Sequence, residues 1–184
     1  TTAINRVAVY GKNASSGFLA NSMLSIYAVP KNLIARQELG SDTTTVTFSS
    51  IPDTYDHLEL TAYARGNSAG VPSRALAISL NSDTTDSNYK TQVIYGSGST
   101  IAAYTQDTRN LVAITAATAT ANIFAASTST FYNYTKTDRH KHFLSTGGFS
   151  GNNAFISSRW TDTSAISTIA LTVNVNDYLS GSIF

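Results

Sequence analysis

The chain contains no cysteine, which excludes disulfide bonds and cysteine-ligated metal sites. Charged residues make up only 12% of its 184 positions, about half of the usual share. With a formal net charge of +1, the chain has no basic stripe that would support sequence-independent binding to nucleic acid. No apolar run approaches the roughly 18 residues that a membrane-spanning helix needs. The sequence therefore predicts neither nucleic-acid binding nor membrane insertion.

Hydroxyl groups dominate what is present: serine and threonine occupy 50 positions, and there are ten tyrosines. Threonine, valine, isoleucine, tyrosine and phenylalanine all favour β-strands. A neutral, hydroxyl-rich composition of this kind is typical of rigid extracellular or virion β-proteins and is unusual for a cytosolic enzyme. The length suits one domain of ordinary size with a real core.

Helical periodicity is nearly absent, and short alternating runs end at Gly, Asn, Asp and Ser. Residues 32–40 could form two turns of helix, but the threonine-rich run that follows favours a strand. The other runs, separated by turn residues, predict an antiparallel jelly-roll-like β-sandwich. The expected strands are residues 44–48, 57–65, 75–80, 89–95, 110–114, 123–134, 140–145, 154–160 and 166–173.

Two of these runs have a clear apolar face. In the first, Leu58, Leu60 and Ala62 share one face, while His57, Glu59, Thr61 and Tyr63 share the other. In the second, Leu76, Ile78 and Leu80 lie together. We expect both apolar faces to point into the core.

The two ends of the chain resemble each other. Residues 1–9 align with 163–171, apolar on apolar, and residues 18–24 align with 178–184. Similarity at long spacing is typical of modular chains. We therefore predict a β-sandwich module over residues 33–184. Before it, residues 29–32 form a linker, and residues 1–28 are either the terminal strands of a preceding module or strands exchanged between copies.

Four oxygen-bearing side chains cluster in one predicted loop: Asn81, Asp83, Asp86 and Asn88. Such ligands suit calcium, but the loop lacks the glycine and distal glutamate of an EF-hand, and these residue types are common in turns. His140 and His142 would share one strand face, yet His57 is the only other histidine. The sequence is therefore consistent with two roles for these side chains, hydrogen bonding within turns or binding of a cation.

Aromatic side chains are the candidates for ligand binding. Trp160, the only tryptophan, is either a core residue or a platform for a sugar ring. Tyr95, Tyr104, Tyr132 and Tyr134 could act with it, because sugar sites combine aromatic faces with polar side chains. The alternative is that these tyrosines are structural, because tyrosine packs well on the faces of β-strands.

Catalytic motifs are missing. The sequence has no Gly-x-Ser-x-Gly elbow for a serine nucleophile, and most of its few carboxylates lie in turn contexts. We expect no catalytic residues, no enzymatic activity and no cofactor.

Three stretches stand out together: residues 46–52 followed by Tyr55 and a strand ending at Ala64-Arg65, residues 77–83 continuing to 87–89, and residues 159–171 with 180–184. Together they resemble a family of β-rich structural proteins of tailed bacteriophages, cyanophages among them. The resemblance covers most of residues 33–184 and is carried by packing and turn residues.

The resemblance implies a virion structural protein of a tail fibre, tail tip or head-surface fibre, located on the phage particle and thus extracellular. Its expected partners are other copies of itself, in a homo-oligomer or a tandem array, and other virion proteins. The alternative is an adhesin module that binds host-surface polysaccharide.

Overall fold

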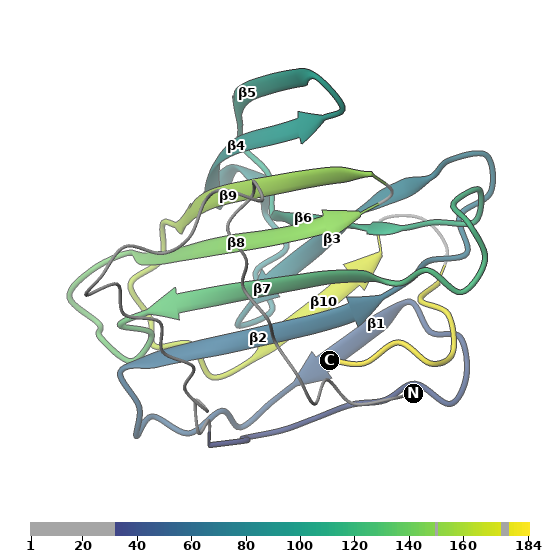
Figure 1. Cartoon of the computed structure of the whole chain (residues 1–184). Coiled ribbons are helices and arrows are strands. Elements are labelled where there is room, and N and C mark those ends of the chain that lie inside the picture. The colour runs from purple at the N-terminus through teal and green to yellow at the C-terminus, as the bar shows by residue number, and fades with distance from the viewer. Residues whose placement is uncertain (1–31, 150, 174–176) are drawn as a thin grey trace, which may run out of the picture. The chain divides into compact units, whose positions relative to one another are not determined.

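The computed structural model of the chain describes residues 32–149, 151–173 and 177–184. Its elements are antiparallel β-strands arranged in two sheets that pack face to face, so the prediction of an all-β sandwich is confirmed (Figure 1). The strand pair predicted within residues 1–28 lies outside the described residues.

The chain divides into two units, Thr1–Asn32 and Leu33–Phe184. In its described part the second unit has ten strands and one short 3-10 helix, Asp86–Asn88. No helix in this part is long and apolar enough to cross a membrane.

The larger sheet has six strands in the order β2-β7-β8-β9-β4-β5, every neighbouring pair antiparallel (Figure 1). The smaller has four, in the order β1-β10-β3-β6. The strands of the larger sheet are β2 (His57–Ala64), β4 (Tyr89–Ser97), β5 (Thr100–Gln106), β7 (Ala125–Tyr132), β8 (Lys141–Phe149) and β9 (Asn152–Trp160). Those of the smaller are β1 (Thr45–Phe48), β3 (Ser73–Leu80), β6 (Asn110–Thr115) and β10 (Ile169–Val173).

The core forms where the apolar faces predicted from alternation meet. Leu76, Ile78 and Leu80 on β3 are completely buried. On β2, Leu58 and Ala62 are buried and Leu60 is half-buried, whereas the alternate side chains are exposed. A one-residue change of register would reverse these faces, so burial of the apolar set specifies the pairing.

Small hydroxyl side chains line part of the inner face of the larger sheet. Ser129 and Ser145 are buried opposite each other, with their Oγ atoms 2.8 Å apart. A Cβ atom added to Gly147 would lie 2.5 Å from the carbonyl oxygen of Ala126, so only glycine fits there. These small residues let β6 pack directly over β7, β8 and β9.

The alanine- and threonine-rich segment between β6 and β7 is bound by the side chain of Arg65, which lies just after β2. This nearly buried guanidinium donates to the carbonyl oxygens of Thr120 at 2.8 Å, Ala119 at 2.9 Å and Ile123 at 3.0 Å. A fourth, longer bond reaches the carbonyl of Ala117 at 3.4 Å. The planar fork of arginine donors suits several carbonyls at once. The segment is therefore a loop held in place by one cation.

Lys141, the first residue of β8, is fully buried and has a similar role. Its ammonium donates to the carbonyl oxygens of Thr163 at 2.8 Å and Arg139 at 3.0 Å, and also to that of Lys136. Burial lowers the pKa of Lys141, and the nearby carboxylates of Asp162 and Asp138 oppose that effect. One side chain thus joins the β7–β8 loop to the segment after β9.

Residues 32–40 form neither the predicted strand nor a helix. Instead, residues 37–39 pair with the last residues of the chain: the backbone N–H of Gln37 donates to Phe184 at 2.9 Å, and that of Leu39 donates to Ser182 at 2.9 Å. Ile183 also pairs with Tyr63 of β2. The residues that accept these backbone hydrogen bonds are about 145 positions away in sequence, so the local sequence pattern cannot predict the pairing.

Candidate binding cleft

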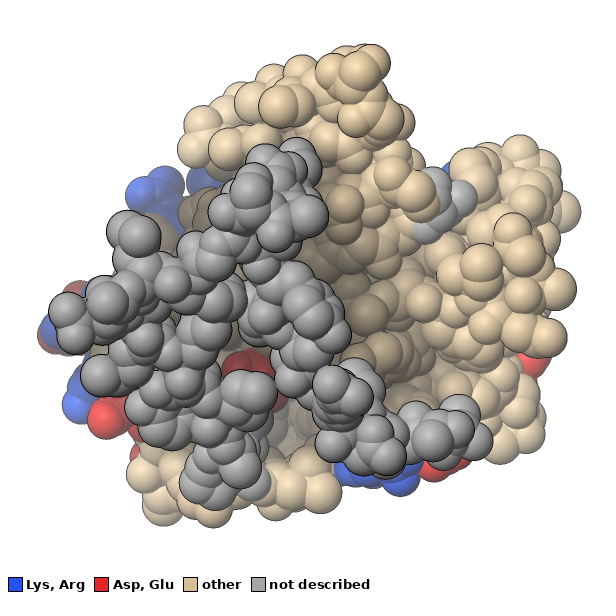
Figure 2. All heavy atoms as spheres, in the orientation of Figure 1, with Lys and Arg blue, Asp and Glu red and all other residues tan. Residues whose placement is uncertain are grey.

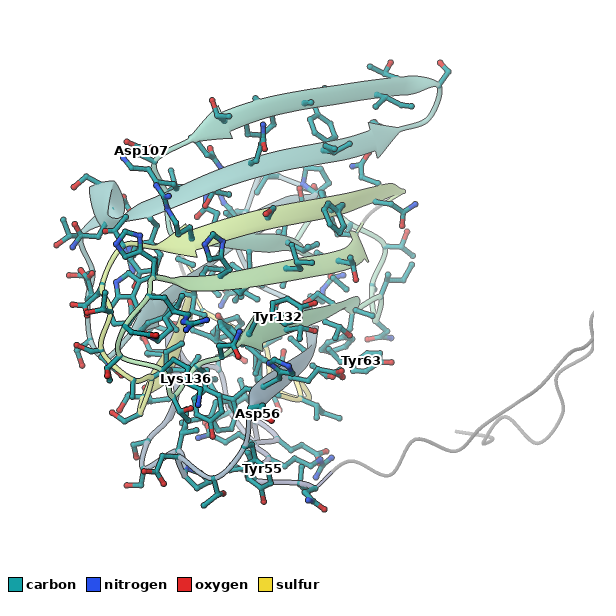
Figure 3. The ribbon with its side chains drawn as sticks, turned by 90° about the vertical axis from the view of Figure 1, so that its left-hand side faces the viewer. Tyr55, Asp56, Tyr63, Asp107, Tyr132 and Lys136 are labelled. Carbon is teal, nitrogen blue, oxygen red and sulfur yellow. The ribbon has the colours of Figure 1, made fainter. Side chains whose placement is uncertain are left out.

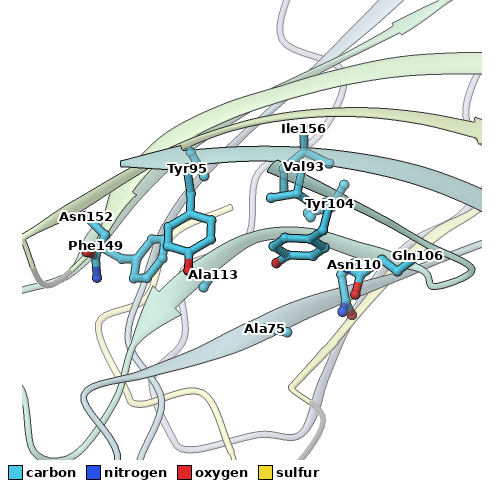
Figure 4. A pocket seen from close by; sticks show the side chains of 12 residues that line it. Ala75, Val93, Tyr95, Tyr104, Gln106, Asn110, Ala113, Phe149, Asn152 and Ile156 are labelled. Carbon is cyan, nitrogen blue, oxygen red and sulfur yellow. The ribbon is translucent and has the colours of Figure 1, made fainter. Parts of the chain in front are cut away.

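A cleft of about 260 Å³ opens beside β6, where the larger sheet extends past the smaller one (Figure 4). The smaller sheet ends at β6, which packs on β7, β8 and β9, so β3 and β6 face the inner side of the β4–β5 hairpin across an open space. The cleft lies between this hairpin and strands β3 and β6.

Two tyrosines form one wall of the cleft. Tyr95 on β4 and Tyr104 on β5 point inward from the hairpin, with ring centroids 6.1 Å apart and planes at 72°, an edge-to-face arrangement (Figure 4). Tyr104 remains 46% exposed. Behind them lie Val93 and Ile156, which with Val112 form a small apolar cluster of their own. The rings are therefore supported by apolar packing and open to solvent.

Amide side chains lie at both ends of the aromatic wall. Gln106 and Asn110 are at one end, and Asn152 is at the other, beside Phe149 (Figure 4). None of the 12 residues that line the cleft is charged. An amide donates and accepts hydrogen bonds, as a hydroxyl group does. The cleft thus offers aromatic faces and neutral hydrogen-bonding groups to a ligand.

Alanines leave the space open on the opposite side. Ala75 and Ala113 face the tyrosines from β3 and β6 (Figure 4). A register shift in β3 between Arg74 and Leu76 accompanies the position of Ala75. Larger apolar residues at these positions would fill the cleft, because protein interiors pack closely.

Of the five aromatic residues predicted as ligand-binding, the structure brings only Tyr95 and Tyr104 together. Tyr132 lies on the outer face of β7, where its ring meets His57 edge-on at 5.3 Å. Figure 3 shows Tyr132 and Tyr63 over the β2–β7 part of the sheet and Asp107 at the β4–β5 end.

Trp160 and Tyr134 are core residues and present no exposed ring. Trp160 is 1% exposed, and its Nε1 donates to the carboxylate of Asp83 at 2.7 Å. Tyr134 is fully buried and donates its hydroxyl to the backbone carbonyl of Pro52. The packing interpretation of Trp160 therefore agrees with the structure, and the platform interpretation does not.

In the Asn81–Asn88 loop, the side-chain oxygens already act as hydrogen-bond acceptors. The amide oxygen of Asn81 accepts from the backbone N–H of Ser167 at 2.9 Å and of Thr168 at 3.2 Å. Its nitrogen donates to the carbonyl of Ala165 at 2.7 Å. Asn81 itself adopts φ 49, a left-handed conformation that asparagine tolerates.

The carboxylates of this loop are similarly engaged. Asp83 accepts from Asn88 at 2.9 Å and from the backbone of Thr85 at 2.9 Å, in addition to Trp160. Burial raises the pKa of Asp83, but these hydrogen bonds outweigh it and hold the pKa below its usual value. Asp86 accepts from Arg109 Nε at 2.9 Å. The loop uses its Asx residues as turn and anchoring groups.

No group of three or more His, Cys, Asp or Glu side chains able to hold a metal ion occurs among the described residues. His142 lies on the outer face of β8, opposite Arg159 of β9. Burial lowers its pKa, and the charge of Arg159 and the neighbouring His140 add to that effect. The histidine pair thus stands beside a cation rather than beside a third ligand.

Sequence reasoning missed β5 and most of the cleft. Four of its lining residues were not predicted, because nothing in the local sequence marks them and only the fold brings them together: Gln106, Asn110, Phe149 and Asn152. One local signal could have found β5: Gly98, with φ 59, is the first of two residues between Ser97 and Thr100, as a type II′ hairpin turn requires.

Comparisons with protein-family models, curated proteins and solved structures find no match for this chain. The fold and the cleft define a class all the same: an antiparallel β-sandwich with an uncharged, aromatic cleft at the overhang of its larger sheet.

Proposed function

We propose that this chain is a non-enzymatic structural module of a tailed-phage virion. The observation that supports the proposal is how the three stretches carrying the resemblance bond to one another. The first joins the third where the backbone N–H of Ile51 donates to Ser167 at 3.0 Å. The second joins the third where Asn81 bonds to Ser167 and where Asp83 accepts from Trp160.

These contacts give the shared residues a common physical role. They fasten loops to strand ends at positions far apart in the chain, which is what a rigid module needs. The indole N–H of Trp160, the one buried donor among them, is paired with Asp83, and leaving such a donor unpaired is costly. The resembling stretches thus hold one another in place within the fold.

Immunogold labelling of the particle whose genome encodes the chain tests this role. An antibody against the sandwich should label the tail or the head surface of intact, purified particles. Labelling confined to the lysate of infected cells, with none on purified particles, would contradict a virion role.

A second candidate function, carbohydrate binding, has its own supporting observation: the neutral cleft with Tyr95 and Tyr104. Apolar ring faces suit the C–H face of a sugar, and the flanking amides match hydroxyl groups that both donate and accept. The volume lies just below the range of about 300–1,000 Å³ common for small-molecule sites, so it suits one sugar ring. The absence of charge in the lining favours neutral over acidic sugars.

Titration with a panel of neutral monosaccharides, followed by calorimetry or by amide chemical shifts, tests the cleft. We expect millimolar dissociation constants, about −4 kcal/mol, for at least one sugar. Tyr104→Ala should abolish binding, and Ala113→Leu should do so by filling the space. Tyr132→Ala, on the outer face, is the matched control and should bind normally.

Two results would count against the cleft. One is the lack of any shift at tens of millimolar sugar. The other is equal loss in the Tyr104→Ala and Tyr132→Ala variants. The virion role would stand in either case, because it depends on the fold residues and not on the cleft.

A further inference from the structure

Strand β5 forms one edge of the larger sheet, at the top of Figure 1. Among the described residues it pairs only with β4, through Ser97↔Thr100 to Thr91↔Gln106. A strand at the edge of a sheet presents a row of unpaired backbone groups that can bind another strand. The outer edge of β5 is therefore a surface whose partner needs explaining.

The hairpin register shows which backbone groups face outward. In a two-residue hairpin the pair that flanks the turn, here Ser97 and Thr100, is hydrogen-bonded, and the bonding alternates from there. The backbone groups of Ile101, Ala103 and Thr105 consequently face away from β4. Because successive side chains alternate, the side chains of these three residues also share the outer face of the sheet.

The usual protection of an edge is missing from β5. Its seven residues include no charged residue, no proline and no glycine. Ile101 is 80% exposed, and Ile94 and Phe155 on the same outer face are 50% and 43% exposed. In Figure 2 the visible surface at the top, where the hairpin projects, is almost entirely uncharged. Natural proteins normally guard a free edge with charges, proline or bulges.

We propose that a second copy of this chain covers this edge, with β5 pairing antiparallel to β5 of the partner copy about a two-fold axis at Ala103. The strand has an odd number of residues, so Ala103 is its centre and faces itself. Ile101 then pairs with Thr105 of the other copy, and Ala102 pairs with Tyr104. The three outward-facing residues of each copy become the hydrogen-bonded pairs.

The strand is complementary to itself in this register. A large side chain, Tyr104, meets a small one, Ala102, and each β-branched Ile101 meets a β-branched threonine, residue types that favour strands. No like charges face each other. The nearest charge, Asp107, is neutralised within its own chain by Lys90 at 2.5 Å. A contact of this kind is closed and symmetric, so it stops at two copies.

The dimer would join the two larger sheets into one continuous sheet, with both clefts on the same face, because Tyr104 points inward in each copy. Two clefts side by side would raise the avidity for a repeating glycan. That consequence rests on the proposed cleft, whereas the dimer itself does not.

The test is sedimentation equilibrium of the full chain. The wild type should approach twice the 19.6 kDa of one chain as its concentration rises. Ala103→Lys and Ala103→Glu each place like charges on the two-fold axis and should weaken dimerisation at least tenfold. An equimolar mixture of the two variants should restore the dimer. Ala126→Lys is the matched control, because Ala126 is an exposed alanine on an interior strand of the same face.

Far-UV circular dichroism confirms that each variant is folded before its mass is compared. A wild type that stays monomeric would overturn the proposal, and so would assemblies larger than a dimer. A mixture of the Lys and Glu variants that stays monomeric would overturn the two-fold register. The monosaccharide titration fails or succeeds independently, since a monomer has a complete cleft.

Discussion

Replacing the buried tyrosines Tyr89 and Tyr178 with phenylalanine, one at a time, is predicted to shift stability in opposite directions. Both side chains are fully buried. The hydroxyl of Tyr89 accepts from the backbone N–H of Leu80 at 3.0 Å and donates to the carbonyl of Asp83 at 3.1 Å. The hydroxyl of Tyr178 has no hydrogen-bond partner among the described residues.

The magnitudes follow from these contacts. Tyr89→Phe leaves the buried N–H of Leu80 without its acceptor, which costs about 1–3 kcal/mol. Tyr178→Phe removes an unpaired buried hydroxyl and breaks no bond, so it should be neutral or stabilise by up to about 1 kcal/mol. In a domain of this size 1 kcal/mol shifts the melting temperature by about 2–4 °C. The two variants should therefore differ by about 1–4 kcal/mol, which is roughly 2–16 °C.

Alkaline pH provides an independent measurement. Burial raises the pKa of Tyr89 to about 12, although its bond from Leu80 opposes the shift. Because the folded pKa lies above the unfolded value of about 10, the stability that this group contributes is fully present below pH 10. It is lost as the pH rises to about 12. Tyr89→Phe should therefore lose less stability than the wild type between pH 10 and 12.

Thermal unfolding followed by far-UV circular dichroism is the appropriate assay, because Tyr89 stacks on Trp160 at 6.3 Å and would alter its fluorescence locally. Tyr132→Phe, on the outer face, is the control and should stay within about 0.5 kcal/mol of the wild type. Equal destabilisation by Tyr89→Phe and Tyr178→Phe would refute the reasoning, because it would mean that hydrogen-bond satisfaction does not separate these two sites.

Three further substitutions test the other buried polar groups. Arg65→Met should destabilise the fold by about 2–4 kcal/mol and accelerate hydrogen exchange in residues 116–124. A hydrogen bond from a charged donor is worth about 1.5–3 kcal/mol, and the exposed loop recovers part of that loss by bonding to water. Unchanged exchange would show that the loop does not depend on the Arg65 guanidinium. Lys141→Met should cost a similar amount in urea unfolding followed by Trp160 fluorescence, because three loop carbonyls lose their donor; no change would mean that burying the ammonium costs as much as its bonds provide. Asp83→Asn should reduce the loss of stability on acidification. Because the pKa of Asp83 is lower in the folded state than its ordinary value of 3.8, its carboxylate stabilises the fold above pH 3.8, and this contribution disappears as the pH falls through the folded pKa. An identical dependence of stability on acid pH in urea titrations of the variant and the wild type would contradict this.

The strands that bury a face were predictable from sequence, and the strand that buries little was not. Alternation located β2 and the apolar face of β3 because one set of alternate apolar side chains in each strand points into the core. In β5 only two of seven residues are even half-buried, so no alternation marks it. Alternation of apolar and polar residues arises where one face of a strand is buried, so a strand with both faces largely exposed shows little of it.

The cleft was predictable only in part, for a related reason. Tyr95 and Tyr104 are conspicuous as residue types, but so are Trp160 and Tyr134, which the core uses. What separates them is position relative to the end of the smaller sheet at β6, and strand order across two sheets cannot be deduced from local sequence. Asn110 and Asn152, at opposite ends of the cleft, come from strands distant in the chain.

The cleft and the free edge have one architectural origin. Because the smaller sheet stops at β6, the inner face of the β4–β5 hairpin borders the cleft, and within the described part of the chain its outer edge is unpaired. A hairpin that contributes little to the core gains little from exposed apolar side chains, and Ile101 and Tyr104 leave apolar surface in water. Selection for folding alone would favour threonine or lysine there. Both exposed side chains fit the contacts proposed above, Ile101 with a second copy and Tyr104 with a ligand in the cleft.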